Sequence, residues 1–224
     1  STAPSPSATP GRGPRADPGA AEAIPLDAFL IATGLVALAE IGDKTQLLSL
    51  LLAARYRRPW PIIAGIAVAT VLNHALATAV GALLAQWLDP QVLRWLVGLA
   101  FLAMALWALH ADHLDEGKVA GASHLGVFGL TVIVFFLAEM GDKTQLATVA
   151  LAARFDEAAL AVVAGTTLGM LLANAPVVFA GHWLLQRLPM IWIRRLAALA
   201  FAVLGILVLL APGGGQIELD HLFV

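Results

Sequence analysis

The stretch "AEIGDKTQLL" occupies residues 39–48, and "AEMGDKTQLA" repeats it at residues 138–147. Each copy places a glutamate, an aspartate and a lysine within five residues, inside very apolar sequence. A charged residue at the centre of a membrane helix costs about 2.5–3.5 kcal/mol, so six unpaired ones would cost roughly 15–20 kcal/mol. That cost exceeds the usual stability of a fold, so these side chains must face one another or a hydrated cavity.

The composition indicates that the chain is embedded in a lipid bilayer. Of its 224 residues, 60% are hydrophobic and 12% are charged, whereas soluble domains carry about 25% charged residues. A net charge of −2 does not favour a nucleic-acid partner, and the absence of cysteine excludes disulfides and thiolate metal sites. Residues 1–25 and 212–224 lack apolar periodicity, and we expect a disordered N-terminal tail and an exposed C-terminal tail.

Six segments are long and apolar enough to cross a bilayer, which takes about 20 residues. They are residues 26–54, 60–87, 92–110, 125–153, 158–186 and 190–211. The two halves match at an offset of about 100 residues, because "LAARY" pairs with "LAARF" and Arg94 and Phe101 pair with Arg194 and Phe201. Such self-similarity along the whole length of both halves indicates a duplication.

Three spans per half is an odd number, so the second copy must cross the membrane upside down, as in many secondary transporters. The sequence therefore predicts an all-α integral membrane protein with six transmembrane helices arranged as two inverted three-helix repeats. Repeat 1 is predicted at 26–111, a cytosolic linker at 112–124 and repeat 2 at 125–211. In the fifth span, "GTTLG" at 165–169 has two small residues four apart, which favours close helix packing.

The positive charges predict the orientation. One side of the predicted membrane has seven, namely Arg55, Arg57, Arg58, Lys118, Arg187, Arg194 and Arg195; the other has four, namely Arg12, Arg15, Arg94 and Arg154. Both termini are therefore expected outside the cytosol. Scarce lysine with abundant alanine and arginine is typical of GC-rich bacterial genomes, so the expected location is the bacterial inner (plasma) membrane.

The repeated motif predicts a cation site near the membrane midplane. In a continuous helix Glu40, Asp43 and Lys44 share one face, as do their counterparts Glu139, Asp142 and Lys143, and each glutamate could pair with the lysine four residues on. Four carboxylates and two ammonium groups sum to −2, which one divalent cation would neutralise. The alternative is that two Glu–Lys pairs merely join the repeats, but this would leave both aspartates without partners.

Neighbouring polar residues extend the candidate ligand set. Carboxylate, amide and hydroxyl oxygens suit Mn²⁺, Ca²⁺ and Mg²⁺. Further candidate ligands are Thr45, Thr144, Gln46 and Gln145 of the motifs and Asn73 and Asn174 of the second helix in each half. The two asparagines are equally well explained as helix-packing amides. Lys44 and Lys143 are expected to balance charge, either as structural counter-ions or as participants in coupling.

Two E-x-G-D-K-(S/T) motifs, "EIGDKT" at 40–45 and "EMGDKT" at 139–144, resemble those of the transmembrane protein 165 family. The resemblance covers residues from about 26 to 211. Eukaryotic members are Golgi Mn²⁺/Ca²⁺ transporters, and bacterial and plastid relatives are manganese transporters. The resemblance implies cation/proton antiport, with Glu40, Asp43, Glu139 and Asp142 as the cation ligands.

We therefore expect a secondary transporter that exports Mn²⁺, with Ca²⁺ as a second candidate cargo, in exchange for protons. Its partners are the lipid bilayer and these ions, and no resident cofactor is expected because the metal is the cargo. An exporter of another cationic substrate, such as a basic amino acid, and a cation channel remain as alternatives. An enzyme is not expected, because the chain has no Ser–His, Asp–Asp or H-E-x-x-H signature. The pattern predicts no particular oligomeric state.

Overall fold

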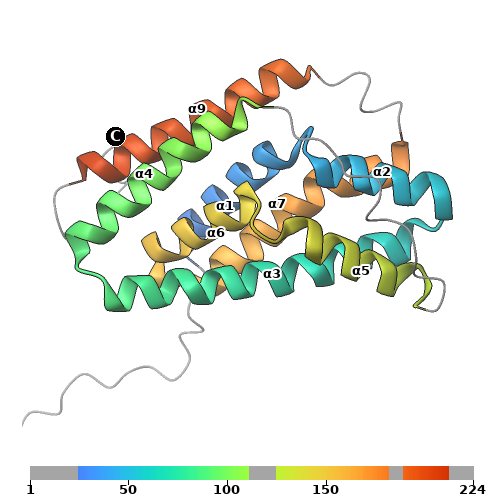
Figure 1. Cartoon of the computed structure of the whole chain (residues 1–224), viewed down its shortest axis with the longest axis horizontal. Helices are drawn as coiled ribbons and strands as arrows, with labels where there is room; N and C mark the ends of the chain where they lie inside the picture. The colour runs from blue at the N-terminus through green and yellow to red at the C-terminus, as the bar shows by residue number, and fades with distance from the viewer. Residues whose placement is uncertain (1–24, 111–124, 182–188, 212–224) are drawn as a thin grey trace, which may run out of the picture.

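A computed structural model describes residues 25–110, 125–181 and 189–211 (Figure 1). Within these ranges all regular structure is helical, which confirms the predicted all-α class. The elements are α1 (Leu26–Glu40), α2 (Lys44–Tyr56), α3 (Pro59–Trp87), α4 (Pro90–Ala108), α5 (Gly126–Glu139), α6 (Lys143–Arg154), the 3₁₀ helix η2 (Asp156–Ala158), α7 (Ala159–Ala180) and α9 (Met190–Leu210). The predicted tails and the predicted linker lie outside the described residues, apart from Pro25.

Four of the described segments are long and apolar enough to cross a membrane, namely Pro59–Trp87, Pro90–Ala108, Asp156–Ala180 and Met190–Leu210. The predicted first and fourth spans are instead divided, into α1 and α2 and into α5 and α6. Each piece is shorter than the roughly 20 residues that a single crossing helix needs. Six crossings and an inverted repeat therefore stay predictions.

The two divisions have the same local cause. Gly42 and Gly141 have φ angles of 84° and 73°, a left-handed conformation that glycine adopts without steric cost. Each glycine ends its helix in a tight turn, closed by a bond from Asp43 N to Glu40 O (3.0 Å) in the first repeat. The prediction that the charged residues of each motif share one face of a continuous helix is therefore wrong.

The two long helices α3 and α7 pack along the divided helices. α3 lies against α5 and α6, and α7 lies against α1 and α2. A Cβ atom built at Gly165 would lie 2.5 Å from Phe29 O, and one at Gly169 would lie 2.6 Å from Thr33 O. Only glycine permits such an approach of two backbones, so the close packing predicted from "GTTLG" is confirmed.

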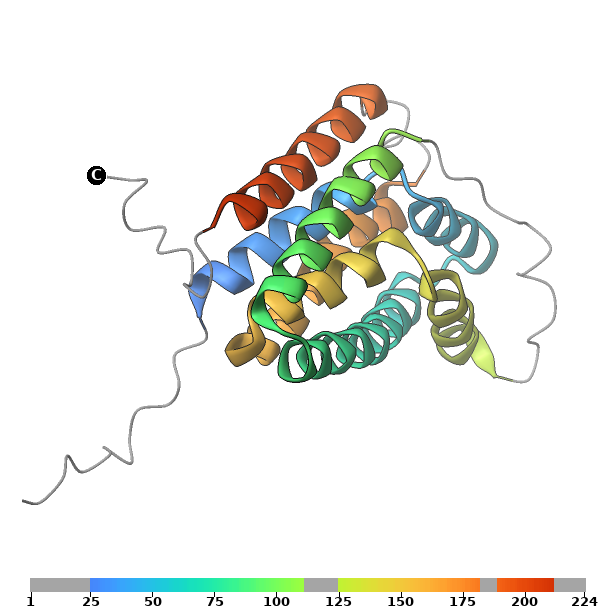
Figure 2. The ribbon, with the colours of Figure 1, turned by 60° about the vertical axis from the view of Figure 1, so that its left-hand side comes forward.

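Helices α4 and α9 lie side by side and cover one end of the bundle, against α6 and α1 (Figure 2). Their outward faces carry exposed leucines, among them Leu96, Leu99, Leu196 and Leu199. Helix α3 also carries exposed leucines, among them Leu72, Leu76 and Leu83. Large exposed apolar surfaces of this extent are typical of lipid contact.

Candidate metal site

Four helix ends meet at the centre of the molecule. α1 ends at Glu40 and α5 ends at Glu139, while Asp43 and Asp142 are the N-cap residues of α2 and α6. The C-terminal ends of α1 and α5 carry partial negative charge and unpaired carbonyl groups. Discontinuous membrane helices of this kind place cation sites between their half-helices.

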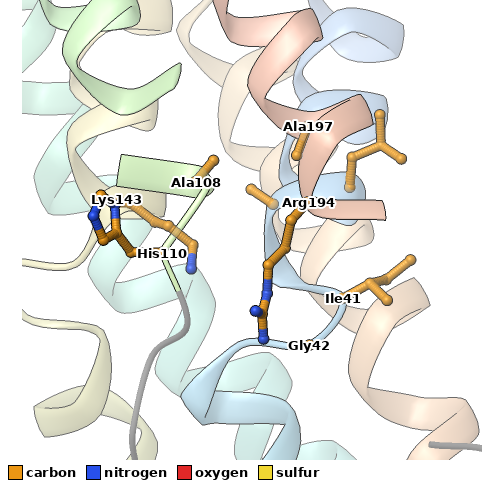
Figure 3. A pocket seen from close by; sticks show the side chains of 9 residues that line it. Ile41, Gly42, Ala108, His110, Lys143, Arg194 and Ala197 are labelled. Carbon is orange, nitrogen blue, oxygen red and sulfur yellow. The ribbon is translucent and has the colours of Figure 1, made fainter. Parts of the chain in front are cut away.

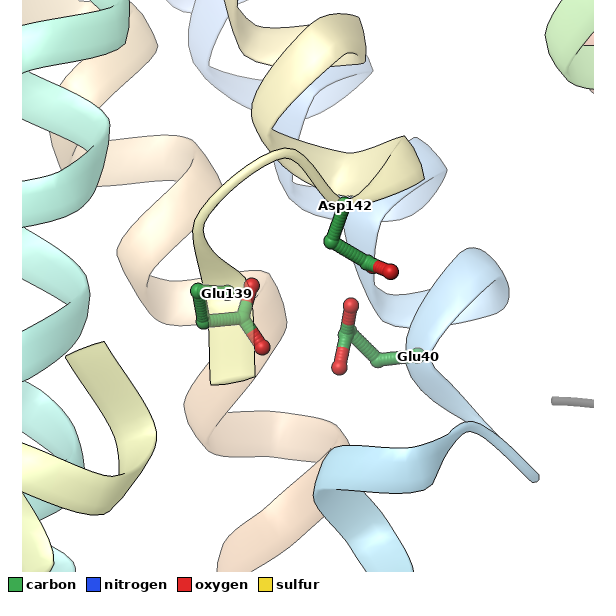
Figure 4. A group of neighbouring side chains, drawn as sticks. All are labelled: Glu40, Glu139 and Asp142. Carbon is green, nitrogen blue, oxygen red and sulfur yellow. The ribbon is translucent and has the colours of Figure 1, made fainter. Parts of the chain in front are cut away.

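Three of the four predicted acidic ligands come together in this centre. Glu40, Glu139 and Asp142 each offer a carboxylate oxygen, and these oxygens all lie within 4.8 Å of one another (Figure 4). The exposed fraction of each residue is 1% or less. Buried carboxylates this close together repel one another when ionised, so they need either a bound cation or a bound proton.

Two of these carboxylates have an oxygen without a donor. Thr45 donates its hydroxyl to Glu40 Oε2, and Thr144 donates to Glu139 Oε2 at 3.0 Å. The Oε1 atoms of Glu40 and Glu139 are buried and have no hydrogen-bond donor among the described residues. Buried polar atoms normally have partners, so these two oxygens point to a ligand. An all-oxygen donor set fits a hard divalent cation.

The lysines pair across the two repeats. Lys44 Nζ lies 2.6 Å from Asp142 Oδ1, and Lys143 forms the reciprocal ion pair with Asp43. The expected pairing of each glutamate with its own lysine is therefore wrong, because the interrupted helix removes the i,i+4 geometry. The aspartates have the lysine partners instead. The alternative of two Glu–Lys pairs joining the repeats would have left the aspartates unpaired. The observed pairing leaves the two glutamates facing each other.

Gln46 and Gln145 hold the two turns closed. Gln46 Oε1 accepts from Gly42 N (2.8 Å), and Gln145 Oε1 accepts from Gly141 N (2.6 Å). The amide nitrogens of both glutamines bond to the long helices. Gln46 Nε2 donates to Ala173 O, and Gln145 Nε2 donates to Asn73 Oδ1. The sequence signal for this role was a glutamine four residues after each glycine. Their assignment as metal ligands stays a prediction.

The two asparagines tie the long helices to the divided ones. Asn73 Nδ2 donates to Phe136 O at 3.0 Å. Asn174 Oδ1 accepts from Ser49 Oγ at 2.7 Å. Both side chains have protein partners, as a packing amide does, and their role as ligands also stays a prediction.

A buried polar stripe on α3 contains His74, which the sequence places at the depth of the motifs beside Asn73, and two threonines that sequence reasoning missed. Thr70, His74 and Thr78 follow one another at four-residue steps and are nearly or fully buried. The hydroxyls of both threonines and both ring nitrogens of His74 have no hydrogen-bond partner among the described residues. The four-residue recurrence of polar residues in an apolar helix was the signal that could have found it.

A small cavity approaches the site from between α1, α4 and α9 (Figure 3). Its polar lining comes from Lys143, His110 and Arg194, and Gly42 forms part of its wall. Sequence reasoning had used Arg194 for the match between the two halves and for the orientation of the chain, and not as a residue near the site. The structure places it next to the turn that carries the motif.

Comparisons with known proteins place nearly the whole of this chain's helical region in one family. A family model described as divalent cation/proton antiporter GDT1 matches residues 28–116 and 127–215. A protein named "Putative manganese exporter" from Vibrio cholerae serotype O1 is 49% identical over 181 residues, covering 81% of this chain and 90% of that protein. GDT1-like protein sll0615 of Synechocystis is 29% identical, covering 73% and 87% of the two chains. No solved structure matches the chain.

Proposed function

The chain belongs to the GDT1 family of divalent cation/proton antiporters, and we propose that its cargo is Mn²⁺, exported from the cytosol. It is a helical membrane transporter, not a catalyst of covalent chemistry. The name of the Vibrio cholerae relative supports manganese as the cargo. Ca²⁺ is a second candidate cargo, because the same oxygen ligands suit both ions.

The ion would bind between Glu40, Glu139 and Asp142. The observation that carries this assignment is the pair of buried Oε1 atoms on Glu40 and Glu139, which have no donor among the described residues. The spacing of the three carboxylate oxygens, within 4.8 Å of one another, suits a single ion better than an amino acid with its own ammonium and carboxylate groups. Asp43 would complete the ligand set once Lys143 moves away.

The two lysines would serve as internal counter-ions. With all four carboxylates ionised and both lysines protonated, the site carries a charge of −2, which one divalent cation neutralises. Lys44 already contacts Asp142, so a metal ion at this carboxylate competes with the ammonium group. Such competition limits affinity, and a transporter needs limited affinity to release its cargo.

Proton exchange follows from the same carboxylates. Acidic ligands bind a metal only when deprotonated, so metal binding releases protons and protons displace metal. A higher proton concentration outside the cell would therefore favour release of Mn²⁺ there. The protons bound in its place would return to the cytosol.

We also propose that the chain crosses the membrane six times, as two inverted repeats with both termini outside the cytosol, in the plasma membrane. The reciprocal ion pairs, Lys44 with Asp142 and Lys143 with Asp43, support the repeat, because each contact has its counterpart at an offset of about 100 residues. In this arrangement α1 with α2 forms the first span, and α5 with α6 forms the fourth.

Reconstituted vesicles test the function directly. An acidic lumen should drive Mn²⁺ uptake, and the substitutions Glu40→Gln and Glu139→Gln should each abolish it. Glu157→Gln is the matched control, because Glu157 is an exposed carboxylate in η2, outside both motifs and beyond the end of α6. Uptake should saturate with Mn²⁺ and should occur without single-channel currents.

Three outcomes would contradict the proposal. Transport that survives both glutamate substitutions would place the site elsewhere. A Mn²⁺ flux that does not depend on the pH gradient would indicate a channel instead of an antiporter. Competition by arginine or lysine, but not by Ca²⁺, would favour an exporter of basic amino acids.

A further inference from the structure

Three polar residues of α3 form a buried row whose polar atoms lack protein partners. Thr70, His74 and Thr78 follow one another at four-residue steps, with exposed fractions of 0%, 0% and 4%. Both ring nitrogens of His74 and both threonine hydroxyls have no hydrogen-bond partner among the described residues. Buried polar atoms normally have partners, so four such atoms in one row indicate a ligand that the row holds in common.

The two threonine hydroxyls do not form the bond that threonines form elsewhere in this protein. In the other helices, four threonines donate to the carbonyl oxygen four residues earlier, at 2.7–2.8 Å. These are Thr33, Thr131, Thr148 and Thr166. Such a bond satisfies a buried hydroxyl within its own helix. Thr70 and Thr78 lack it, so their hydroxyls are left for a partner outside the backbone of α3.

The equivalent row of α7 differs. At the offset of 100 residues that relates α3 to α7, the row positions are occupied by Met170, Asn174 and Val178. Two of these side chains are apolar. The third is bonded on both sides, because Asn174 Oδ1 accepts from Ser49 Oγ at 2.7 Å and Asn174 Nδ2 donates to Met170 O at 3.1 Å. Within the described helices, a row of unpartnered polar atoms is therefore a feature of the first repeat.

The middle of the row lies at the level of the carboxylate cluster. Asn73, the residue before His74, donates to Phe136 O at 3.0 Å and accepts from Gln145 Nε2 at 3.2 Å. These two contacts flank Glu139 and its turn in the sequence, so they fix His74 at the depth of that turn. With a rise of about 1.5 Å per residue, the row extends roughly 6 Å along α3 in both directions from this level.

The two ends of the row differ in how they are closed. Towards the start of α3, the same four-residue steps lead to Ile66 and Ile62, whose exposed fractions are both 0%. Towards the end of α3 they lead to Ala82, which is small and only partly buried. The start of α3 follows Arg57 and Arg58, which lie on the cytosolic side in the proposed orientation. The polar row is therefore sealed towards the cytosol by large apolar side chains and continues towards the outside.

Water is the ligand that fits these four atoms. A neutral imidazole offers one donor and one acceptor, and each hydroxyl offers both. Buried water molecules form two to four hydrogen bonds with polar groups that would otherwise have no partner. A metal ion fits less well, because His74 is the single strong metal ligand of the row and the row has no carboxylate.

We propose that Thr70, His74 and Thr78 hold a line of water molecules that conducts protons between the outer end of α3 and the carboxylate cluster, by a route separate from that of the metal ion. Each member of the line accepts one proton and passes another on, so no group in the row changes its net charge. The inference rests on the proposed function, in which the cluster exchanges metal for protons, and adds the route of the proton. The three residues are positioning residues and do not touch the cargo.

Water beside a buried side chain can be detected without any transport. Brief X-ray irradiation converts bound water into hydroxyl radicals, which oxidise the side chain next to it. We expect oxidation of His74 in the wild-type protein and protection of Met104, which is equally buried in the apolar cluster of α4 and α9. Thr78→Val should lower the oxidation of His74 by about three- to tenfold, as expected for one lost hydrogen bond.

Two assays in reconstituted vesicles separate the proton route from the metal site. Exchange of Mn²⁺ for Mn²⁺ moves no net protons, whereas Mn²⁺ uptake driven by an acidic lumen requires them. Thr78→Val should slow the pH-driven uptake by about three- to tenfold and leave the Mn²⁺ exchange unchanged. His74→Leu should slow the uptake further, because it removes both ring nitrogens, and His74→Asn, which keeps a donor and an acceptor, should recover part of the rate.

Thr166→Val is the matched control, because Thr166 is as buried as Thr70 but donates to Val162 O of its own helix. It should leave both assays unchanged.

Three outcomes would overturn the proposal. The first is equal slowing of both assays in the row variants, which would place the row on the route of the metal or in the folding of the chain. The second is pH-driven uptake at the wild-type rate in His74→Leu. The third does not depend on variants that fold: in the wild type, His74 stays unoxidised or is oxidised no more than Met104. Oxidation of His74 in a protein that exchanges no Mn²⁺ would instead count against the proposed cargo alone.

Discussion

Lys44 lies 2.6 Å from Asp142, about one hundred residues away in the chain and in the opposite repeat. The reciprocal pair joins Lys143 to Asp43. Each repeat thus supplies the counter-ion for the aspartate of the other, while the two glutamates are left to face each other with unpartnered oxygens. The charge that a metal ion must neutralise is therefore held jointly by the two repeats.

Removing either lysine should destabilise the metal-free protein and favour metal binding. Lys143→Met should cost about 3–5 kcal/mol, as for a buried ion pair that loses one member. Lys44→Met should cost less, about 2 kcal/mol, because 25% of the Lys44 side chain is exposed to solvent. Thermal unfolding measures both, and added Mn²⁺ should recover more stability in each variant than in the wild type.

Arg195→Met is the control for these variants, because it removes an exposed cation outside the site. A smaller Mn²⁺ stabilisation in the lysine variants would mean that the lysines support the metal site instead of competing with the metal.

The site should bind divalent cations in the absence of any gradient. At one hundred times the dissociation constant, a bound ion stabilises the folded state by about 2.7 kcal/mol. We expect Mn²⁺ and Ca²⁺ to raise the unfolding temperature, and Glu40→Gln and Glu139→Gln to reduce this rise. Zn²⁺ should do less, because the site offers oxygen ligands only. If no divalent cation raised the unfolding temperature of the wild type, the carboxylate cluster would not be a metal site.

The two motif glycines should differ in their tolerance of a side chain. Alanine at either position costs about 1–2 kcal/mol because of the positive φ angle. Gly42→Ala should cost more than Gly141→Ala, since its Cβ atom would also meet the sulfur of Met190. Met190→Ala should remove this extra cost, which a double-mutant cycle of unfolding free energies measures.

Gly34→Ala is the reference substitution for that cycle, because nothing lies within 4 Å of the added Cβ atom. Equal costs at Gly42 and Gly141 would contradict this extra cost and would show that the flexible Met190 side chain moves aside.

The glutamines should be needed for stability at the turns. Gln145→Leu removes the acceptor of the exposed Gly141 N–H, and the loss of one such hydrogen bond costs about 0.5–1.5 kcal/mol. Urea or thermal unfolding should show this loss, whereas Gln86→Leu on the exposed face of α3 should change stability by less than about 0.5 kcal/mol. An unfolding free energy of Gln145→Leu equal to that of the control would contradict a turn-closing role.

Much of the site could be predicted from the sequence because its motif occurs twice in the chain. The repeated motif, the apolar segments and the cost of buried charge together predicted a shared acidic site, and the structure brings Glu40, Glu139 and Asp142 together. The pairing of each lysine with the aspartate of the other motif could not be predicted from the sequence. The i,i+4 rule holds only where a helix continues, and the glycine of each motif ends the helix before the lysine is reached.

By itself, the sequence determined the helical class, the lipid environment and the two matching halves, because composition and repetition are properties of the chain that packing cannot alter. The tertiary structure alone decided which lysine meets which aspartate, that the two motif glutamines close the turns, and on which side of the site α4 and α9 lie. The physical reason is that the ion pairs join residues about a hundred positions apart and the packing of α4 and α9 joins distant helices, while the glutamine contacts form only once each helix has ended in its turn.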